Sequence, residues 1–143
     1  MVGFDVSLLF LILLAYGLQT GAFPPNHKVN INGKFTCQGK ALFGQKRVRV
    51  EIWEVDTFRD DHLFSGWPLV DGTYRFTTSH NEYGGIKPYV YIYHSCGGHC
   101  RKITFEGDYI NPGRTYELKD KGQIAQGCEE QRFPASYGTK PSK

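Results

Sequence analysis

The chain has 143 residues, with 17 Lys and Arg against 14 Asp and Glu, so its formal net charge is only +3. This length is typical of one domain, and the 17 glycines and 7 prolines follow no repeat, which excludes collagen-like and low-complexity material. Aromatic residues make up 15% of the chain, which is more than an intrinsically disordered chain carries. The small and evenly spread charge gives no basis for nucleic-acid binding.

The first 22 residues have the composition of a secretory signal peptide. The stretch from Val6 to Leu18 is almost entirely apolar, is too short to span a bilayer, and is followed by small residues that end at Ala22. Cleavage there predicts a secreted, extracellular domain over residues 23–128, an extended tail over residues 129–143, and no remaining transmembrane segment. The segment before Val6 carries Asp5 and no Lys or Arg, so an uncleaved anchor is the alternative.

Alternating apolar and polar residues predict six or seven short strands. In residues 28–37 one parity is apolar (Val29, Ile31, Phe35, Cys37) and the other polar (Asn30, Asn32, Lys34, Thr36). Similar alternation occurs in residues 47–55, 72–77, 88–96, 101–110 and 115–119, and turn residues such as Asp71-Gly72 separate these segments. Only residues 79–84 leave room for a short helical turn. The pattern therefore predicts an all-β, antiparallel β-sandwich.

All four cysteines follow the export segment: Cys37, Cys96, Cys100 and Cys128. An even number in an exported chain predicts two disulfides. A zinc site formed by Cys96 and Cys100 with His94 and His99 is the alternative, but Cys37 and Cys128 are each solitary, whereas structural zinc sites use two close pairs.

Strand parity favours one of the three possible disulfide pairings. Cys37 and Cys96 both fall on the apolar parity, so they should meet between the sheets. Stacked sheets lie about 10 Å apart, whereas a disulfide needs Cα atoms about 5.5–6 Å apart, so the pair should lie near an end where the sheets converge. Cys100 begins a strand on the opposite parity and Cys128 begins the tail. We therefore expect Cys37 with Cys96 and Cys100 with Cys128.

Three groups of residues together resemble the nematode transthyretin-like family. They are Phe35-Thr36-Cys37 with Gly39-Lys40, the Asp71-Gly72 turn before Tyr74 and Phe76, and Tyr93-His94-Ser95-Cys96 followed by Cys100-Arg101-Lys102. The resemblance covers roughly residues 28–128. It implies a secreted, transthyretin-like (prealbumin-like) Greek-key β-sandwich of about seven strands, no cofactor and no enzyme activity. One branch of the family is linked to bridging phosphatidylserine to a phagocyte receptor.

The sequence lacks the functional residues of two better understood proteins that share this fold. Hydroxyisourate hydrolases carry a His in the first strand and a C-terminal Tyr-Arg-Gly-Ser signature, whereas this chain has Ser136-Tyr137-Gly138-Thr139 and only His27 just before the strand. Vertebrate transthyretin binds its hormone against a sheet whose counterpart here has polar outward positions such as Asn30, Lys34 and Glu117. Hydrolysis is therefore the least favoured reading, and hormone carriage does not follow.

The opposite sheet offers a candidate binding face. If the second strand pairs with the strand at residues 88–94, as the resemblance implies, the outward residues are Arg47, Arg49, Trp53, Tyr89, Tyr91, Tyr93 and Lys102. Tyr, Trp and Arg are enriched in interface hot spots, and arginine binds phosphate and carboxylate. We expect a non-enzymatic recognition protein that binds an extracellular or cell-surface partner, including an anionic lipid headgroup. The plainer alternative is a solvated face whose aromatic pairs only stabilise the sheet.

Two further readings stay open. The loop of Asp56, Asp60 and Asp61 has oxygen ligands that Ca²⁺ accepts, but its spacing matches no calcium motif, so no metal site is assigned. The second function hypothesis is a carrier of a small hydrophobic ligand, held between the sheets or at a dimer interface.

Overall fold

The computed structural model describes residues 22–106 and 114–128. The predicted signal peptide, apart from Ala22, the predicted tail and residues 107–110 of the strand expected at 101–110 lie outside these ranges. Within them, no helix has the length and apolar character needed to cross a membrane.

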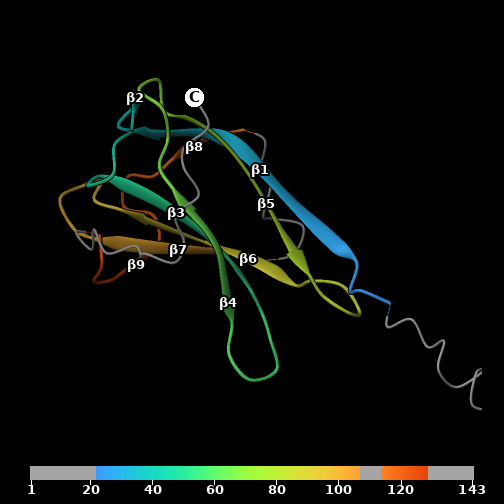
Figure 1. The fold of residues 1–143 in the computed structure, drawn as a ribbon. Coiled ribbons are helices and arrows are strands. Elements are labelled where there is room, and N and C mark those ends of the chain that lie inside the picture. The colour runs from blue at the N-terminus through green and yellow to red at the C-terminus, as the bar shows by residue number, and fades with distance from the viewer. Residues whose placement is uncertain (1–21, 107–113, 129–143) are drawn as a thin grey trace, which may run out of the picture.

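The described residues form nine strands in two layers (Figure 1). Sheet A contains β1 (Asn26–Cys37), β2 (Lys40–Ala41), β5 (Thr73–Asn81) and β8 (Thr115–Glu117). Sheet B contains, in spatial order, β4 (Asp61–Gly66), β3 (Val48–Glu54), β6 (Pro88–His94), β7 (Arg101–Glu106) and β9 (Gln123–Ile124). This arrangement confirms the predicted all-β, two-sheet sandwich.

Sheet A is organised around β1, which is long enough to pair with three strands. It runs antiparallel to β5 from the Asn26–Asn81 pair to the Lys34–Thr73 pair, and it turns back into β2. Its pairing with β8 is parallel, so this sheet is not wholly antiparallel as the sequence had suggested. The chain reaches β8 from the other sheet rather than through a hairpin, so nothing imposes the antiparallel direction there.

Several boundaries differ from those predicted. Residues 79–81 continue strand β5, so the expected helical turn is wrong for them: Ser79 pairs with Lys28 and His80 with His27 across the long β1. Strand β4 was not predicted because its residues do not alternate between apolar and polar. Its first five residues are all half-buried and only Gly66 is buried, so neither side of the strand is distinctly apolar. The two-residue strands β2 and β9 are too short to carry a periodic signal at all.

The core lies between the sheets and is built from the parity that the sequence indicated. Its fully buried members, all at most 2% exposed, include Ile31, Phe35, Val50, Ile52, Val90 and Ile92. Large side chains therefore occupy the space between the sheets, which is one of the two places where the carrier hypothesis would put a ligand. Close packing of this kind fixes the orientation of both sheets, and hence of the side chains on their outer faces.

His94 is a polar residue buried beside the core, and both of its ring nitrogens form hydrogen bonds. Its Nδ1 accepts the Cys96 N–H at 3.3 Å, so its Nε2 donates to the Lys121 carbonyl at 3.0 Å. Burial lowers the pKa of His94 below 6.5, which keeps the ring neutral and suited to this pair of bonds. The expectation that His94 is structural rather than a general base agrees with these contacts.

Both disulfides form as the parity argument predicted. Cys37 at the end of β1 bonds Cys96 just after β6, with their Cα atoms 5.7 Å apart, and Cys100 bonds Cys128 at 5.6 Å. The first bridge joins the two sheets at one end of the sandwich. Because all four cysteines are oxidised, the alternative zinc site with His94 and His99 is ruled out.

The carboxylate of Glu117 ties β8 to the β1–β2 turn. It accepts the backbone N–H groups of Gly39 at 2.9 Å and Gln38 at 2.8 Å, and it also accepts from Lys119 N–H and the Thr36 hydroxyl. These bonds, led by that from Gly39, lower the pKa of Glu117 from 4.5 to about 2. The turn itself needs this anchor, since Gln38 takes the left-handed φ of 54° that side chains other than glycine disfavour.

Glu117 should therefore contribute a pH-dependent part of the stability. Its pKa is lowered by folding, so its contribution is complete above pH 4.5 and is lost as the pH falls towards 2. Because the group is solvent-exposed, we expect Glu117→Gln to cost only about 1–2 kcal/mol at neutral pH. Urea unfolding between pH 2 and 7 would measure this difference, and the two proteins should converge near pH 2. A gap that persists at pH 2 would contradict the assignment.

Candidate recognition face

The outer side of sheet B carries the predicted binding residues. Strand register aligns Arg49 with Tyr93, Glu51 with Tyr91 and Trp53 with Tyr89, and β7 adds Lys102 beside Tyr93. We call this set the aromatic face: Arg49, Glu51, Trp53, Tyr89, Tyr91, Tyr93 and Lys102. Arg47 lies in the turn directly before β3, next to the aromatic face, and is exposed. The structure thus aligns six of the seven predicted residues on neighbouring strands of sheet B, together with Glu51, which had not been selected, whereas Arg47 lies in the turn before β3.

The rings of the aromatic face contact one another along β6. Tyr91 lies at the centre: its ring is edge-on to Tyr89 at 5.1 Å and to Tyr93 at 6.2 Å, and it is 6.4 Å from Trp53. The Lys102 ammonium lies 4.2 Å above the centre of the Tyr91 ring. Ring pairs and cation–π contacts of this kind hold the side chains in fixed positions before any partner arrives.

Arg49 is not an open anion-binding fork, which corrects one part of the prediction. Its side chain is 5% exposed, stacks on Tyr93 at 4.6 Å, donates through Nε to Glu51 at 2.8 Å and through Nη1 to the Gly127 carbonyl at 2.8 Å. The segment before Cys128, pinned by its disulfide, therefore covers this end of the face. Strand parity set the direction of the side chain correctly, but it carried no information about a distant segment that folds over it.

Tyr89 is also covered, which corrects a second part of the prediction. It is 7% exposed, and its hydroxyl donates to the Asp60 carboxylate at 2.7 Å. Burial, followed by this hydrogen bond, raises the pKa of Tyr89 well above its usual value, so the hydroxyl remains a donor. The loop between β3 and β4, which projects from the sandwich in Figure 1, thus supplies the side chain that closes the other end of the face.

Glu51 and the neighbouring strand β4 complete the polar network. Glu51 Oε2 accepts the Trp53 indole N–H at 3.0 Å, and the Trp53 ring meets the edge of His62 on β4. His62 Nε2 lies 2.6 Å from the Ser65 hydroxyl, and burial lowers the pKa of His62. Sequence reasoning missed this pair, because β4 itself was missed. It is not arranged as a catalytic triad, since the nearby Glu51 carboxylate is bound to Arg49 and Trp53.

The part of the face that solvent reaches is therefore narrower than predicted. Tyr91, Tyr93, Trp53 and Lys102 are half-buried at its centre, and Arg47 is exposed at its edge. With Arg49 neutralised by Glu51, the accessible cations are Arg47 and Lys102. This surface can contact a partner through planar rings, and the positive charges of Arg47 and Lys102 add a weak electrostatic attraction for anionic groups.

The acids of the loop after β3 do not converge on a calcium site of their own. Asp60 binds the Tyr89 hydroxyl and the Asp56 N–H, Asp56 accepts the N–H of Thr57, and Asp61 faces His80 on β5. Their carboxylates are thus used separately, two to shape the loop and one at the seam between the sheets.

Comparison with known proteins identifies the fold and the relatives. A family model described as the Transthyretin-like family matches residues 32–106, which include the central strands of both sheets. The chain belongs to the transthyretin-like family. It is 31% identical over 99 residues to "Transthyretin-like protein 1" of Caenorhabditis elegans, an alignment that covers 64% of this chain and 62% of that protein. The aligned part is thus less than two thirds of that transthyretin-like protein.

Among solved structures, a 9R-lipoxygenase from Cyanothece PCC8801 shows a weak likeness. It is 14% identical, has a TM-score of 0.36, and the match covers 64% of this chain and 16% of that chain. A likeness of this size has no bearing on the function of this transthyretin-like chain.

Proposed function

We propose that this chain is a secreted, non-enzymatic recognition protein that binds an extracellular or cell-surface partner through the accessible part of the aromatic face. Membership of the transthyretin-like family supports a non-enzymatic binding protein, and the two disulfides fit an extracellular one. The proposal goes further by naming the surface and its mode of contact.

The observation that carries the proposal is the preordered centre of the face. Tyr91 is held by Tyr89, Tyr93 and Lys102, so its ring is presented at little further cost in conformational entropy. Half-buried aromatic rings with an adjacent cation are typical of interface hot spots. A face that served the sheet alone would not need a tyrosine at every outward position of β6.

The charges define the chemistry of the partner. Under this proposal the rings contact a protein, and the two cations, Lys102 at the centre of the face and Arg47 at its edge, meet an anionic group such as the headgroup of phosphatidylserine. Arg49 has no role in that contact, because its guanidinium is already bound within the face. The electrostatic attraction between these two cations and an anionic partner should weaken as salt is added, since both cations reach solvent.

The test is a triple substitution, Arg47→Ala, Tyr91→Ala and Lys102→Ala. We expect binding to cell surfaces, and to liposomes that contain phosphatidylserine, to weaken at least about tenfold, which corresponds to about 1.4 kcal/mol. The matched control removes the same residue types elsewhere, by Lys28→Ala, Arg75→Ala and Tyr83→Ala, all at exposed positions outside the aromatic face. Equal binding by a folded triple variant, or an equal loss in the control, would remove the face from the function.

A further inference from the structure

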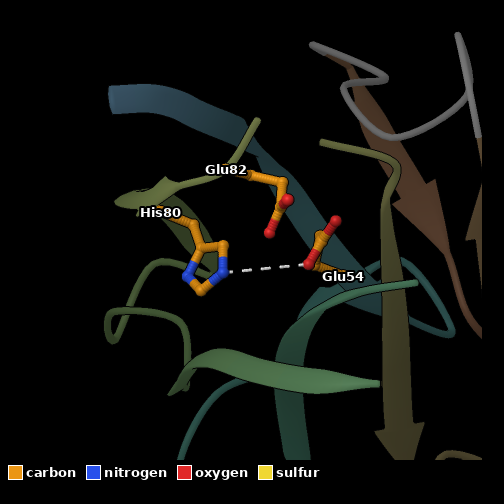
Figure 2. A group of neighbouring side chains, drawn as sticks. All are labelled: Glu54, His80 and Glu82. Atoms are coloured by element: carbon orange, nitrogen blue, oxygen red, sulfur yellow. Dashed lines mark ion pairs between the residues drawn. The ribbon is translucent and has the colours of Figure 1, made fainter. Parts of the chain in front are cut away.

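The end of the sandwich opposite the Cys37–Cys96 bridge brings together ligands from both sheets. Glu54 closes β3 in sheet B, His80 lies near the end of β5 in sheet A, and Glu82 follows that strand. One ligand atom from each of these three residues lies within 4.8 Å of the others. Figure 2 shows the imidazole and the two carboxylates turned towards one another across the gap between the elements.

The burial of Glu54 distinguishes this cluster from a group of acidic side chains on the surface. Its side chain is only 4% exposed, and its Oε2 has no hydrogen-bond partner among the described residues. This oxygen points to His80 Nε2 at 3.9 Å, as the dashed line in Figure 2 marks. A carboxylate oxygen withdrawn from water and left without a donor is costly, so it calls for a positive partner.

Among the described residues, the ion pairs made by the carboxylates of this cluster are those with His80. Asp61 at the start of β4 also approaches, with its Oδ2 at 3.4 Å from the same His80 nitrogen. Three carboxylates therefore surround one imidazole, which can carry at most a single positive charge. A divalent cation would satisfy the buried oxygen of Glu54 and offset the remaining repulsion.

We propose that Glu54, His80 and Glu82 form a binding site for Zn²⁺, with Asp61 within reach as a further oxygen ligand. The imidazole nitrogen favours zinc over Ca²⁺ and Mg²⁺, which prefer oxygen ligands throughout. Tetrahedral zinc with bonds of about 2.0–2.1 Å places its ligands about 3.3 Å apart. The distances from His80 to Glu54 and Asp61 are close to that spacing, so modest side-chain rotation would complete the site.

Zinc at this position would link the sheets where no disulfide does. Glu54 belongs to sheet B and His80 to sheet A, so a shared ion would join β3 to β5 at the end remote from Cys37 and Cys96. It would also fix the start of the loop after β3, which carries Asp60 to Tyr89 on the aromatic face.

Calorimetric titration of the secreted, disulfide-bonded chain with ZnCl₂, after removal of metal with EDTA, tests the site directly. We expect one ion per chain, and an affinity at least about tenfold lower in His80→Gln and in Glu54→Gln. His99→Gln and Glu106→Gln, which alter the same residue types at exposed positions, should leave the affinity unchanged. The absence of binding, or equal affinity in all variants, would overturn the proposal. So would tighter binding of CaCl₂ that does not depend on His80.

Thermal unfolding distinguishes a metal site from a simple His80–Glu54 ion pair. With Zn²⁺ present, the melting temperature of the natural chain should rise, and that of Glu54→Gln should not. In EDTA, Glu54→Gln should be at least as stable as the natural chain, because the substitution removes an unsatisfied buried charge. Lower stability of Glu54→Gln in EDTA, with no effect of Zn²⁺ on the natural chain, would show that the cluster serves as an ion pair alone.

Discussion

Replacing Cys37 and Cys96 together by alanine is expected to lower the free energy of unfolding by about 4 kcal/mol. The bridge closes a segment of 59 residues, and a crosslink of that span removes about this much chain entropy from the unfolded state. Cys96 is also 1% exposed, so the substitution leaves a small void in the core. Since domains of this size are stable by only about 5–15 kcal/mol, the loss is a large fraction of the total.

The second disulfide provides the matched control. Cys100 and Cys128 are 28 residues apart, so the entropic contribution of their bridge is smaller by about 0.5–1 kcal/mol. Urea unfolding of both double-alanine variants, under the same oxidising conditions, gives the two free energies. We expect the Cys37→Ala/Cys96→Ala protein to be the less stable one. The reverse order would mean that the segment before Cys128, and not the junction of the two sheets, dominates the stability.

Arg49→Ala should also destabilise the protein strongly. We expect it to lower the free energy of unfolding by about 3 kcal/mol. The substitution removes the ion-pair partner of Glu51, whose side chain is only 14% exposed, and leaves that carboxylate with the indole N–H of Trp53. Breaking a buried ion pair on one side is costly because the other charge stays desolvated. The stacking on Tyr93 and the bond to the Gly127 carbonyl are lost as well.

Two controls make this result specific. Arg47→Ala, two residues earlier and exposed, should change the free energy of unfolding by less than about 0.5 kcal/mol. Combining Arg49→Met with Glu51→Gln should recover most of the stability, because no unpaired charge then remains and the stem of Met still packs on the face. A loss in Arg47→Ala equal to that in Arg49→Ala, measured by urea unfolding, would contradict the distinction between the two arginines.

This distinction changes the view of the recognition surface. A face of seven predicted residues becomes a smaller, preordered patch centred on Tyr91, with Arg49 and Tyr89 serving to hold it in place. The stability and the binding predictions therefore concern different residues. Arg49→Ala should act chiefly on folding, whereas Arg47→Ala, Tyr91→Ala and Lys102→Ala should act chiefly on partner binding.

The sequence by itself determined the strands with a clean period of two and the side of each strand that faces the core, and it favoured the disulfide pairing that the structure shows. Val29, Ile31 and Phe35 on β1 and Val90 and Ile92 on β6 are buried as their parity requires, since a pleated strand must alternate its side chains. The transthyretin-like family followed from short motifs in the same strands. The alternation is local and can be read from consecutive residues, whereas the disulfide pairing was inferred from the parity and strand position of each cysteine.

Only the tertiary structure decided what covers the outer face and what meets at the ends of the sandwich. Arg49 is buried by residues near Gly127, Tyr89 by Asp60, and Glu54 lies beside His80, pairs that are 26 or more residues apart in the chain. Parity states which way a side chain points, but not which distant segment lies there. The covered arginine and the Glu54–His80–Glu82 cluster depend on such long-range packing, whereas β4, which pairs with the neighbouring β3, was missed because its residues do not alternate.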